Sequence, residues 1–316
     1  MRRILIVIAI VVAGLLAGLT AFDYLAPEKA AEIGVGLERA RNGLAEKQIT
    51  VNGLTIAYLD GGPATGEPLV LIHGFGADKD NFTRVSGYLT PQYRVIIPDL
   101  PGFGESSRPA AADYTVGAQA DRVQAFAQAL GITRAHFGGS SMGGAIITAH
   151  ALKYPDATAS LWLLGPGGLS KAFDSELGKT IQETGKNPLL AQTPEEFPAI
   201  MQFVMSKPPF FPYSVKHVLG KRAAADYPLH GRIFVQINDP QQAYPSFDGL
   251  IKDIQAPALV VWGNEDRALN HEAARIYKAE MPRAEIIIMD GIGHLPMIEA
   301  ARQSAKDYLA FRGRIQ

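Results

Sequence analysis

The feature that most constrains this chain is a short glycine-rich turn between an apolar run and a helix-like run. The pentapeptide Gly139-Ser140-Ser141-Met142-Gly143 has the pattern G-x-S-x-G, with residues 135–137 before it and residues 145–152 after it. A strand that passes directly into a helix through small residues can hold one serine in a sharp turn with its hydroxyl exposed. Glycine is required on either side because larger side chains would collide across the turn. This register selects Ser141 as the candidate nucleophile.

A serine hydroxyl needs a base to take its proton, and an imidazole suits that task near neutral pH. Of the seven histidines, His294 lies in a late loop, after the strand-like residues 285–289 and before a helix that begins near Pro296. We therefore expect His294 to be the base. His73 follows another strand, and we expect it to hold its own loop by hydrogen bonding.

A carboxylate must orient the imidazole and stabilise its positive charge. Asp266 ends the segment Val260-Val261-Trp262-Gly263-Asn264-Glu265-Asp266, a buried strand followed by a glycine turn. We expect Asp266 to be this acid, with Glu265 as the main alternative. Asp99 is expected to fasten a loop, and Asp290 to cap the loop that contains His294.

Backbone N–H groups that face the oxygen of the attacked carbonyl are usually the largest contribution to such catalysis. One comes from the residue after the nucleophile, and the other from a loop that follows an earlier strand. Here the strand-like residues 69–72 end in His73-Gly74-Phe75-Gly76. We expect the N–H groups of Phe75 and Met142 to form the oxyanion hole.

In their order along the chain, these segments resemble the α/β-hydrolase superfamily. Within it, the chain looks most similar to the membrane-anchored acylglycerol lipases and the bacterial phospholipases A. The resemblance is carried by Leu71-Ile72-His73-Gly74-Phe75-Gly76-Ala77-Asp78-Lys79-Asp80-Asn81-Phe82, Pro98-Asp99-Leu100-Pro101-Gly102-Phe103-Gly104-Glu105-Ser106, the G-x-S-x-G segment, Trp262-Gly263-Asn264-Glu265-Asp266 and Gly293-His294. It covers nearly everything after about Gln48. Ser141 stands where haloalkane dehalogenases and epoxide hydrolases of this superfamily carry Asp, so the resemblance implies a carboxylic ester hydrolase without a cofactor or metal.

Strand-like and helix-like runs alternate after residue 47, and several strands are continuously apolar. This pattern predicts an α/β-hydrolase fold: a mostly parallel eight-stranded sheet with helices on both faces. Asn52-Gly53 predicts a hairpin between the first two strands. The expected strands are 48–51, 54–59, 69–72, 94–97, 135–138, 160–164, 258–262 and 285–289, and the expected core helices are 80–89, 117–130, 142–153, 271–281 and 296–311.

Residues 167–230 interrupt this alternation, and we expect them to form an inserted helical lid between two parts of the hydrolase core, 47–166 and 231–316. Helical patterns cover 175–184, 194–205 and 213–225. A lid rich in Met and Phe suits a flexible apolar ligand. The alternative is that these helices only bury one face on the core. The expected substrate contacts are Phe203, Met205, Phe210 and Phe211.

The N-terminal residues 1–22 are expected to form a transmembrane anchor. Ile4 to Phe22 is an uncharged apolar run, and as a helix it would span ~28 Å, against ~30 Å for the hydrocarbon core of a bilayer. Arg2 and Arg3 precede it, which places the N-terminus in the cytoplasm and the catalytic domain on the periplasmic or extracytoplasmic side. The alternative, a cleaved signal peptide, is disfavoured by the length of the run and by the lack of an A-x-A site.

Residues 23–46 are expected to contain a juxtamembrane amphipathic helix, from Pro27 to Leu44. Its apolar stripe consists of Ile33, Leu37, Ala40 and Leu44. Such a helix can lie on the lipid surface, pack on the hydrolase or pair with a partner helix.

Gly14 and Gly18 form a G-x-x-x-G motif within the apolar run. Small residues at this spacing let two transmembrane helices approach closely, so we expect a homodimer formed through this helix. The alternative is that glycine and alanine are simply common in membrane spans.

The composition excludes other classes of protein. A net charge of −1 over 316 residues and the lack of a basic stripe argue against nucleic-acid binding. The lack of cysteine removes disulfides and zinc–thiolate sites. We therefore predict a membrane-anchored serine hydrolase that cleaves lipid esters. A small-ester carboxylesterase, a C–C bond hydrolase and a non-catalytic membrane scaffold or receptor on the same fold remain as alternatives.

Overall fold

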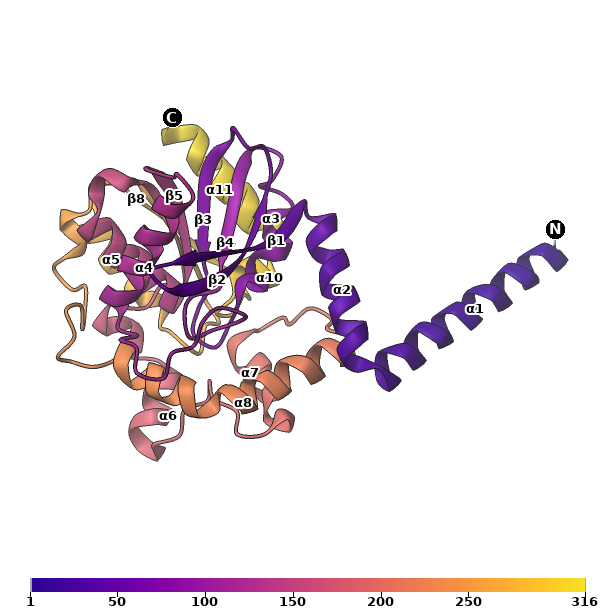
Figure 1. Cartoon of the computed structure of the whole chain (residues 1–316). Helices are drawn as coiled ribbons and strands as arrows, with labels where there is room; N and C mark the ends of the chain where they lie inside the picture. The colour runs from indigo at the N-terminus through magenta and orange to yellow at the C-terminus, as the bar shows by residue number, and fades with distance from the viewer. Residues whose placement is uncertain (1, 316) are drawn as a thin grey trace.

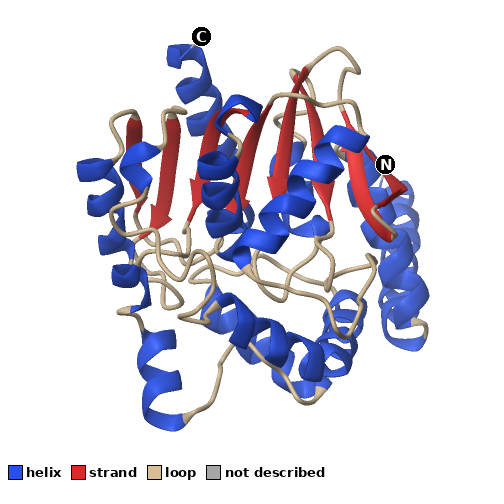
Figure 2. Ribbon diagram, turned by 60° about the vertical axis from the view of Figure 1, so that its left-hand side comes forward, coloured by secondary structure: helices blue, strands red, loops and turns tan. Residues whose placement is uncertain are grey.

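A computed structural model describes residues 2–315, and its central element is one eight-stranded sheet (Figure 2). The strand order is β1-β2-β4-β3-β5-β6-β7-β8, in which β1–β2 and β2–β4 pair antiparallel and all other neighbours pair parallel. This confirms the predicted mostly parallel sheet. The strands are β1 Leu44–Val51, β2 Leu54–Gly61, β3 Glu67–Ile72, β4 Tyr93–Pro98, β5 Ala135–Ser140, β6 Thr158–Leu164, β7 Ala258–Gly263 and β8 Ala284–Met289.

Helices cover both faces of the sheet, which explains why its strands are continuously apolar. Leu69 and Leu71 of β3 pack into one apolar layer with α3, α10 and α11, whereas Val70 and Ile72 pack into the other with α4, α5 and α9. These covering helices are α3 Thr83–Ser86, α4 Val116–Ala129, α5 Met142–Lys153, α9 Ala274–Glu280, α10 Pro296–Glu299 and α11 Ala301–Ile315.

Three further helices, α6 Glu176–Thr184, α7 Phe197–Val204 and α8 Tyr213–Ile237, are inserted between β6 and β7. They lie beyond the carboxyl ends of the strands (Figure 2). The sequence placed the end of this segment at residue 230, but α8 continues through Pro228 to Ile237. Proline in a helix interior costs about 3 kcal/mol, and tertiary packing offsets it here. Ile233 is fully buried and lies against Gly102.

Two predicted core helices are each divided in the structure. The helix predicted over 296–311 breaks at Ala300, whose φ of −134° is not helical, and so forms α10 and α11. The helix predicted over 80–89 is a 3₁₀ turn, Lys79–Phe82, followed by the short α3. Both segments carry helical periodicity in the sequence, which does not distinguish one continuous helix from two short ones.

The first helix, α1 Arg2–Leu25, projects away from the rest of the chain (Figure 1). Its stretch Arg3–Leu25 is long and apolar enough to cross a membrane. The large apolar side chains described along it are exposed to at least 38%, as expected for a helix that contacts lipid. A break at Ala26 separates α1 from α2 Pro27–Arg41.

The helix α2 packs on the rest of the chain, but only part of the apolar stripe that the sequence suggested is buried. Ala31 and Leu44 are buried. Charges add to the contact: Arg39 pairs with Asp80 at 2.6 Å and with Glu46 at 2.7 Å. Ile33 and Leu37 of the stripe remain exposed. The helix also ends earlier than predicted, because Gly43 adopts a φ of +72° and the chain enters β1 at Leu44.

A buried ammonium group holds together the loops that follow β3 and β4. Lys79 is 1% exposed, and its Nζ lies 2.9 Å from Asp99 Oδ2 and 2.7 Å from Glu105 Oε2. Burial lowers the pKa of Lys79, but Asp99 and Glu105 outweigh it and raise that pKa above its usual value. Asp99 also accepts hydrogen bonds from the backbone N–H groups of Lys79 and Glu105, so it fastens its loop as predicted.

Replacing this ammonium group with an apolar side chain, Lys79→Met, is expected to lower the free energy of unfolding by about 3–5 kcal/mol, because it leaves the carboxylate of Asp99 buried without its partner. Urea denaturation measures this loss. Lys29→Met is the control, because Lys29 forms an exposed pair with Glu32, and it should change the stability by less than about 0.5 kcal/mol. Equal effects of the two substitutions would contradict the importance of the buried pair.

Candidate active site

Ser141 occupies a strained turn between β5 and α5. Its φ of 55° and ψ of −118° are rare for any residue except glycine. A Cβ on Gly139 would lie 2.4 Å from the carbonyl oxygen of Gly143, and a Cβ on Gly143 would lie 2.2 Å from that of Ile72. The two glycines of the motif are therefore required by close backbone approach. Ser140 is fully buried, which agrees with the choice of Ser141 as the exposed serine.

His294 and Asp266 form a hydrogen bond of 2.7 Å between Nδ1 and Oδ2. The Asp266 side chain is fully buried and that of His294 is 5% exposed. Asp266 is held by other donors: its Oδ1 accepts from the N–H groups of Ala268 and Leu269 at 2.8 and 2.9 Å, and its Oδ2 accepts from Trp262 Nε1 at 2.8 Å. The carboxylate is thus held in place by three donors besides His294, and it fixes the orientation of the His294 ring.

The other two candidate carboxylates, Glu265 and Asp290, form hydrogen bonds with groups other than His294. Glu265 bonds to the hydroxyl of Ser206 at the end of α7. Asp290 accepts from Asn264 Nδ2 at 3.0 Å, so it binds the loop after β7 and does not cap its own loop as predicted. Asp266 is the carboxylate that contacts His294.

Two consecutive residues, the last of β6 and the one after it, lie between Ser141 and the His294–Asp266 pair. The N–H of Ser141 donates to Leu164 O at 3.0 Å. The next residue, Gly165, has a φ of +49°, and a Cβ there would lie 3.3 Å from His294 Nδ1 and 3.4 Å from Asp266 Oδ2. The serine, the histidine and the aspartate thus meet at the carboxyl end of the sheet, although they come from three different loops.

His73 fixes the peptide that presents the N–H of Phe75. Burial lowers the pKa of His73, so its ring is neutral: Nε2 accepts from Leu100 N at 3.0 Å, and Nδ1 donates to Gly74 O at 2.8 Å. Because Gly74 C=O and Phe75 N–H belong to one trans peptide unit, this bond sets the direction of the N–H. A Cβ on Gly74 would lie 3.2 Å from Ser141 Cβ, so the peptide is close to the serine.

The N–H groups of Phe75 and Met142 are available for an incoming oxygen. Neither donates a hydrogen bond to any group in residues 2–315. Both residues line the same cavity as Ser141. Two N–H donors beside a nucleophile can stabilise the negative charge that develops on an attacked carbonyl.

The cavity at Ser141 is small and apolar, with a volume of about 60 Å³. The four predicted lid contacts do not line it. Met205 is buried in the core layer of α10 and α11, Phe210 is 84% exposed, and Phe203 and Phe211 lie under the guanidinium groups of Arg267 and Arg84. Instead, the insertion and its flanks contribute Phe173, Leu177, Leu189, Phe234 and Ile237. The sequence did not reveal this, because apolar residues occur along the whole insertion.

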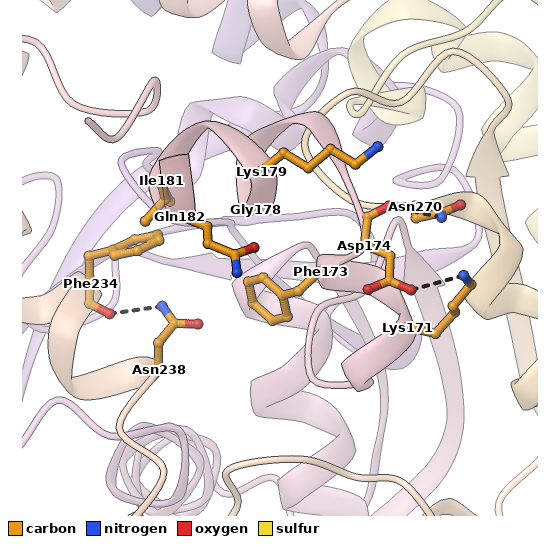
Figure 3. Close-up of a pocket in the computed structure, with 10 residues that line it drawn as sticks. All are labelled: Lys171, Phe173, Asp174, Gly178, Lys179, Ile181, Gln182, Phe234, Asn238 and Asn270. Atoms are coloured by element: carbon orange, nitrogen blue, oxygen red, sulfur yellow. Dashed lines mark hydrogen bonds and ion pairs between the residues drawn. The ribbon is translucent and has the colours of Figure 1, made fainter. Parts of the chain in front are cut away.

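A larger pocket of about 770 Å³ adjoins this cavity and shares Phe173, Phe234 and Asn238 with it. Figure 3 shows its polar groups, which include Lys171 and Lys179, around the aromatic rings of Phe173 and Phe234. Among the described residues, no group of three His, Cys, Asp or Glu side chains is placed to hold a metal ion. The two pockets together form an amphipathic approach to Ser141.

Comparison with known proteins agrees with this geometry. Residues 67–210 match the family of the alpha/beta hydrolase fold. Lipase 3 of Moraxella sp. (strain TA144) is 42% identical over 282 residues, which are 87% of this chain and 87% of that protein. The chain belongs to the α/β-hydrolase family.

Two further proteins that are similar to this chain carry the names of lipid-hydrolysing enzymes. The crystal structure of a membrane phospholipase A, a bacterial virulence factor, is 38% identical with a TM-score of 0.88, and the match covers 100% of this chain and 99% of that chain. The monoacylglycerol lipase ABHD6 of Rattus norvegicus is 26% identical over 261 residues, 79% of this chain and 77% of that protein. These similarities bear out the resemblance to the lipase and phospholipase A branch.

Trp262 is a contributor to the site that the sequence reasoning missed, although it lies in the segment that ends at Asp266. Its fully buried indole donates to the same carboxylate oxygen that His294 contacts. The signal was a buried aromatic residue with an N–H, since such a group nearly always has a partner.

Trp262→Phe is expected to lower the rate of ester hydrolysis about 10-fold, because a hydrogen bond to a charged group contributes about 1.5–3 kcal/mol. The phenyl ring retains most of the packing, so the protein should remain folded. Turnover of a p-nitrophenyl ester and a thermal melt measure the two effects. Trp162→Phe is the matched control, since that indole N–H is buried without a partner among the described residues. Equal activities of the two variants would contradict the role of Trp262.

Proposed function

We propose that this chain is a membrane-anchored serine hydrolase that cleaves carboxylic ester bonds of lipids. The observation that carries the proposal is the 2.7 Å hydrogen bond between His294 and Asp266 beside the strained Ser141 turn. Enzymes named lipase, monoacylglycerol lipase and membrane phospholipase A are its relatives. A non-catalytic scaffold has no need of a strained serine next to a buried imidazole–carboxylate pair.

In this proposal Ser141 is the nucleophile and His294 the general base. The Nδ1 proton of His294 is held by Asp266, so Nε2 takes the proton of the Ser141 hydroxyl as Oγ attacks the ester carbonyl. The N–H groups of Phe75 and Met142 stabilise the oxyanion. His294 then gives the proton to the departing alcohol, which leaves an acyl group on Ser141. A water molecule, deprotonated by His294, releases the fatty acid and restores the serine.

The apolar insertion serves as a lid over this site, and the lipid ester reaches Ser141 through the adjoining pocket. The inner cavity of about 60 Å³ is much smaller than the outer pocket of about 770 Å³, so it receives the reacting part of a substrate. The outer pocket has room for the remainder, and its lysines and aromatic rings suit a molecule with a polar and an apolar end.

The helix α1 is proposed to remain on the mature protein as a single-pass anchor. Its end is built into the hydrolase: Asp23 accepts from the N–H groups of Tyr213 and Ser214 at 3.0 and 3.2 Å, and Tyr24 stacks on Tyr213 with ring centroids 4.4 Å apart. A cleaved signal peptide has no need of such contacts. The arginines before the span favour a cytoplasmic N-terminus and an extracytoplasmic catalytic domain.

Substitution of the proposed triad, as Ser141→Ala, His294→Ala or Asp266→Asn, should leave a folded protein whose activity is lower by about 10⁴-fold, because such residues act as a unit. A fluorophosphonate probe should label the native protein but not Ser141→Ala. Ser140→Ala and Glu265→Gln are the matched controls and should retain turnover. Full activity of Asp266→Asn would instead assign the acid to another carboxylate.

Activity against membrane lipids is expected to peak at medium or long acyl chains and not to rise steadily with length. A chain drawn from lipid has already left water, so it gains less than the ~0.8 kcal/mol per methylene of transfer from water. The size of the pocket then determines which acyl-chain length is hydrolysed fastest. Turnover of monoacylglycerols, lysophospholipids and diacyl phospholipids in vesicles measures this selectivity.

Deletion of residues 4–22 should weaken turnover of these vesicle lipids but spare a soluble p-nitrophenyl ester. An enzyme that cleaves only soluble esters or carbon–carbon substrates would contradict the lipid proposal.

Association of two chains through α1 is proposed from Gly14 and Gly18, where a Cβ would meet no other atom within 4 Å. Such open positions allow close approach of a second helix. Replacing both glycines with isoleucine should reduce cross-linked dimer in membranes, whereas Leu15→Ile with Leu19→Ile should not. Unchanged cross-linking in the glycine variant would exclude this contact.

A further inference from the structure

We propose that Glu299 is a positioning residue that ties the loop of His294 to the end of α7, so that the insertion and the catalytic base hold each other in place. The end of α7 is called the insertion arm here, residues 204–207. The inference rests on the proposed role of His294 as the base. It assigns a function to a carboxylate that touches neither Ser141 nor Asp266.

The backbone N–H groups of residues 293–295 all donate hydrogen bonds to Glu299 or to the insertion arm. The N–H of Gly293 lies 3.1 Å from both carboxylate oxygens of Glu299, and that of Leu295 lies 3.3 Å from Oε1. The N–H of His294 itself donates to Val204 O of the insertion arm at 2.8 Å. The backbone on each side of the imidazole is therefore fixed by groups outside its own loop.

The same carboxylate holds the insertion arm. Its Oε2 accepts from the N–H groups of Ser206 and Lys207, each at 2.8 Å. These groups follow the last turn of α7, where no helical partner is available. An ionised carboxylate offers about four acceptor positions and no donor. Glu299 uses this capacity on four N–H groups from two segments, which a glutamine cannot do because its NH₂ group would face donors.

Close packing between the two segments supports the same conclusion independently of the hydrogen bonds. A Cβ on Gly293 would lie 2.6 Å from Ser206 N and 3.0 Å from Met205 Cα, so the arm and the loop are in backbone contact. Met205 is 3% exposed and packs in the same apolar layer as Ile292 and Leu295. The glycine before His294 is thus required by the insertion and not by the turn alone.

This contact couples the position of the insertion to the geometry of catalysis. A misplacement of the base by about 1 Å can cost about 10²-fold in rate, because proton transfer depends on the distance and direction of the hydrogen bond.

Glu299→Gln in the full-length protein tests the proposal. We expect a fall of about 10-fold or more in both kcat for a short p-nitrophenyl ester and the rate of fluorophosphonate labelling, with KM changed by less than about two-fold. Backbone hydrogen exchange should become faster in both 204–207 and 293–295. Glu299→Asp, which keeps both acceptor oxygens, should recover part of the loss.

Glu280→Gln is the matched control. Glu280 is also partly buried and accepts from a loop N–H, that of Gly249, at 3.2 Å, but it lies away from His294. It should change neither the labelling rate nor exchange in the two segments. Gly293→Ala provides a second route, because its Cβ would lie 2.6 Å from Ser206 N and 3.0 Å from Glu299 Oε1 and so displaces the arm and the carboxylate together, and it should reproduce the effect of Glu299→Gln.

Native labelling and turnover by folded Glu299→Gln would overturn the proposal, and so would faster exchange in 293–295 with an unchanged insertion arm. If the native protein itself is not labelled, the proposed hydrolase function fails instead. The exchange measurement still decides whether Glu299 joins the two segments, since it does not depend on any reaction of Ser141.

Discussion

The organisation of this site depends on one steric constraint, the close approach of backbones around the Ser141 turn. The turn fits only because Gly139 and Gly143 lack a Cβ. The carbonyl group of Gly143 can therefore lie against Gly139, and that of Ile72 can lie against Gly143. The parallel arrangement of β3, β5, β6 and β7 then brings their carboxyl ends to one edge. One part of the site follows each strand in turn: the peptide that presents the Phe75 N–H after β3, Ser141 after β5, Gly165 after β6 and Asp266 after β7.

Hydrogen bonds to backbone groups orient most of what surrounds the serine. His73 sets a peptide, Asp266 is held by two N–H groups and an indole, and Glu299 gathers four N–H groups. Asp266 finds these donors in its own segment, whereas His73 also accepts from Leu100 and Glu299 from Ser206 and Lys207 in other loops. Such cross-loop bonds fix positions without adding to the chemistry, and they leave few degrees of freedom for the reacting groups.

The sequence predicted the strands and the residues that meet at the sheet edge, because those features depend on local patterns. All eight strands were predicted, although β1 begins at Leu44 and not at Gln48, and His294 contacts Asp266 and not Glu265. Contacts between distant segments were beyond such reasoning. The continuation of α8 past Pro228 depends on Ile233 packing near Gly102, and the pocket lining depends on which face of the insertion turns inward. Phe203 and Phe234 look alike in the sequence, but only Phe234 lines the pocket.

The helix α8 extends from the end of the anchor to the pocket. Its first N–H groups are bound by Asp23, whereas Phe234 and Ile237 near its other end line the cavity at Ser141. A straight helix of this length measures about 37 Å, and each added residue rotates everything beyond it by about 100°. The helix is therefore a spacer whose phase matters as much as its length. Relatives that lengthen or shorten it must do so by nearly whole turns, or rebuild the pocket wall with different side chains.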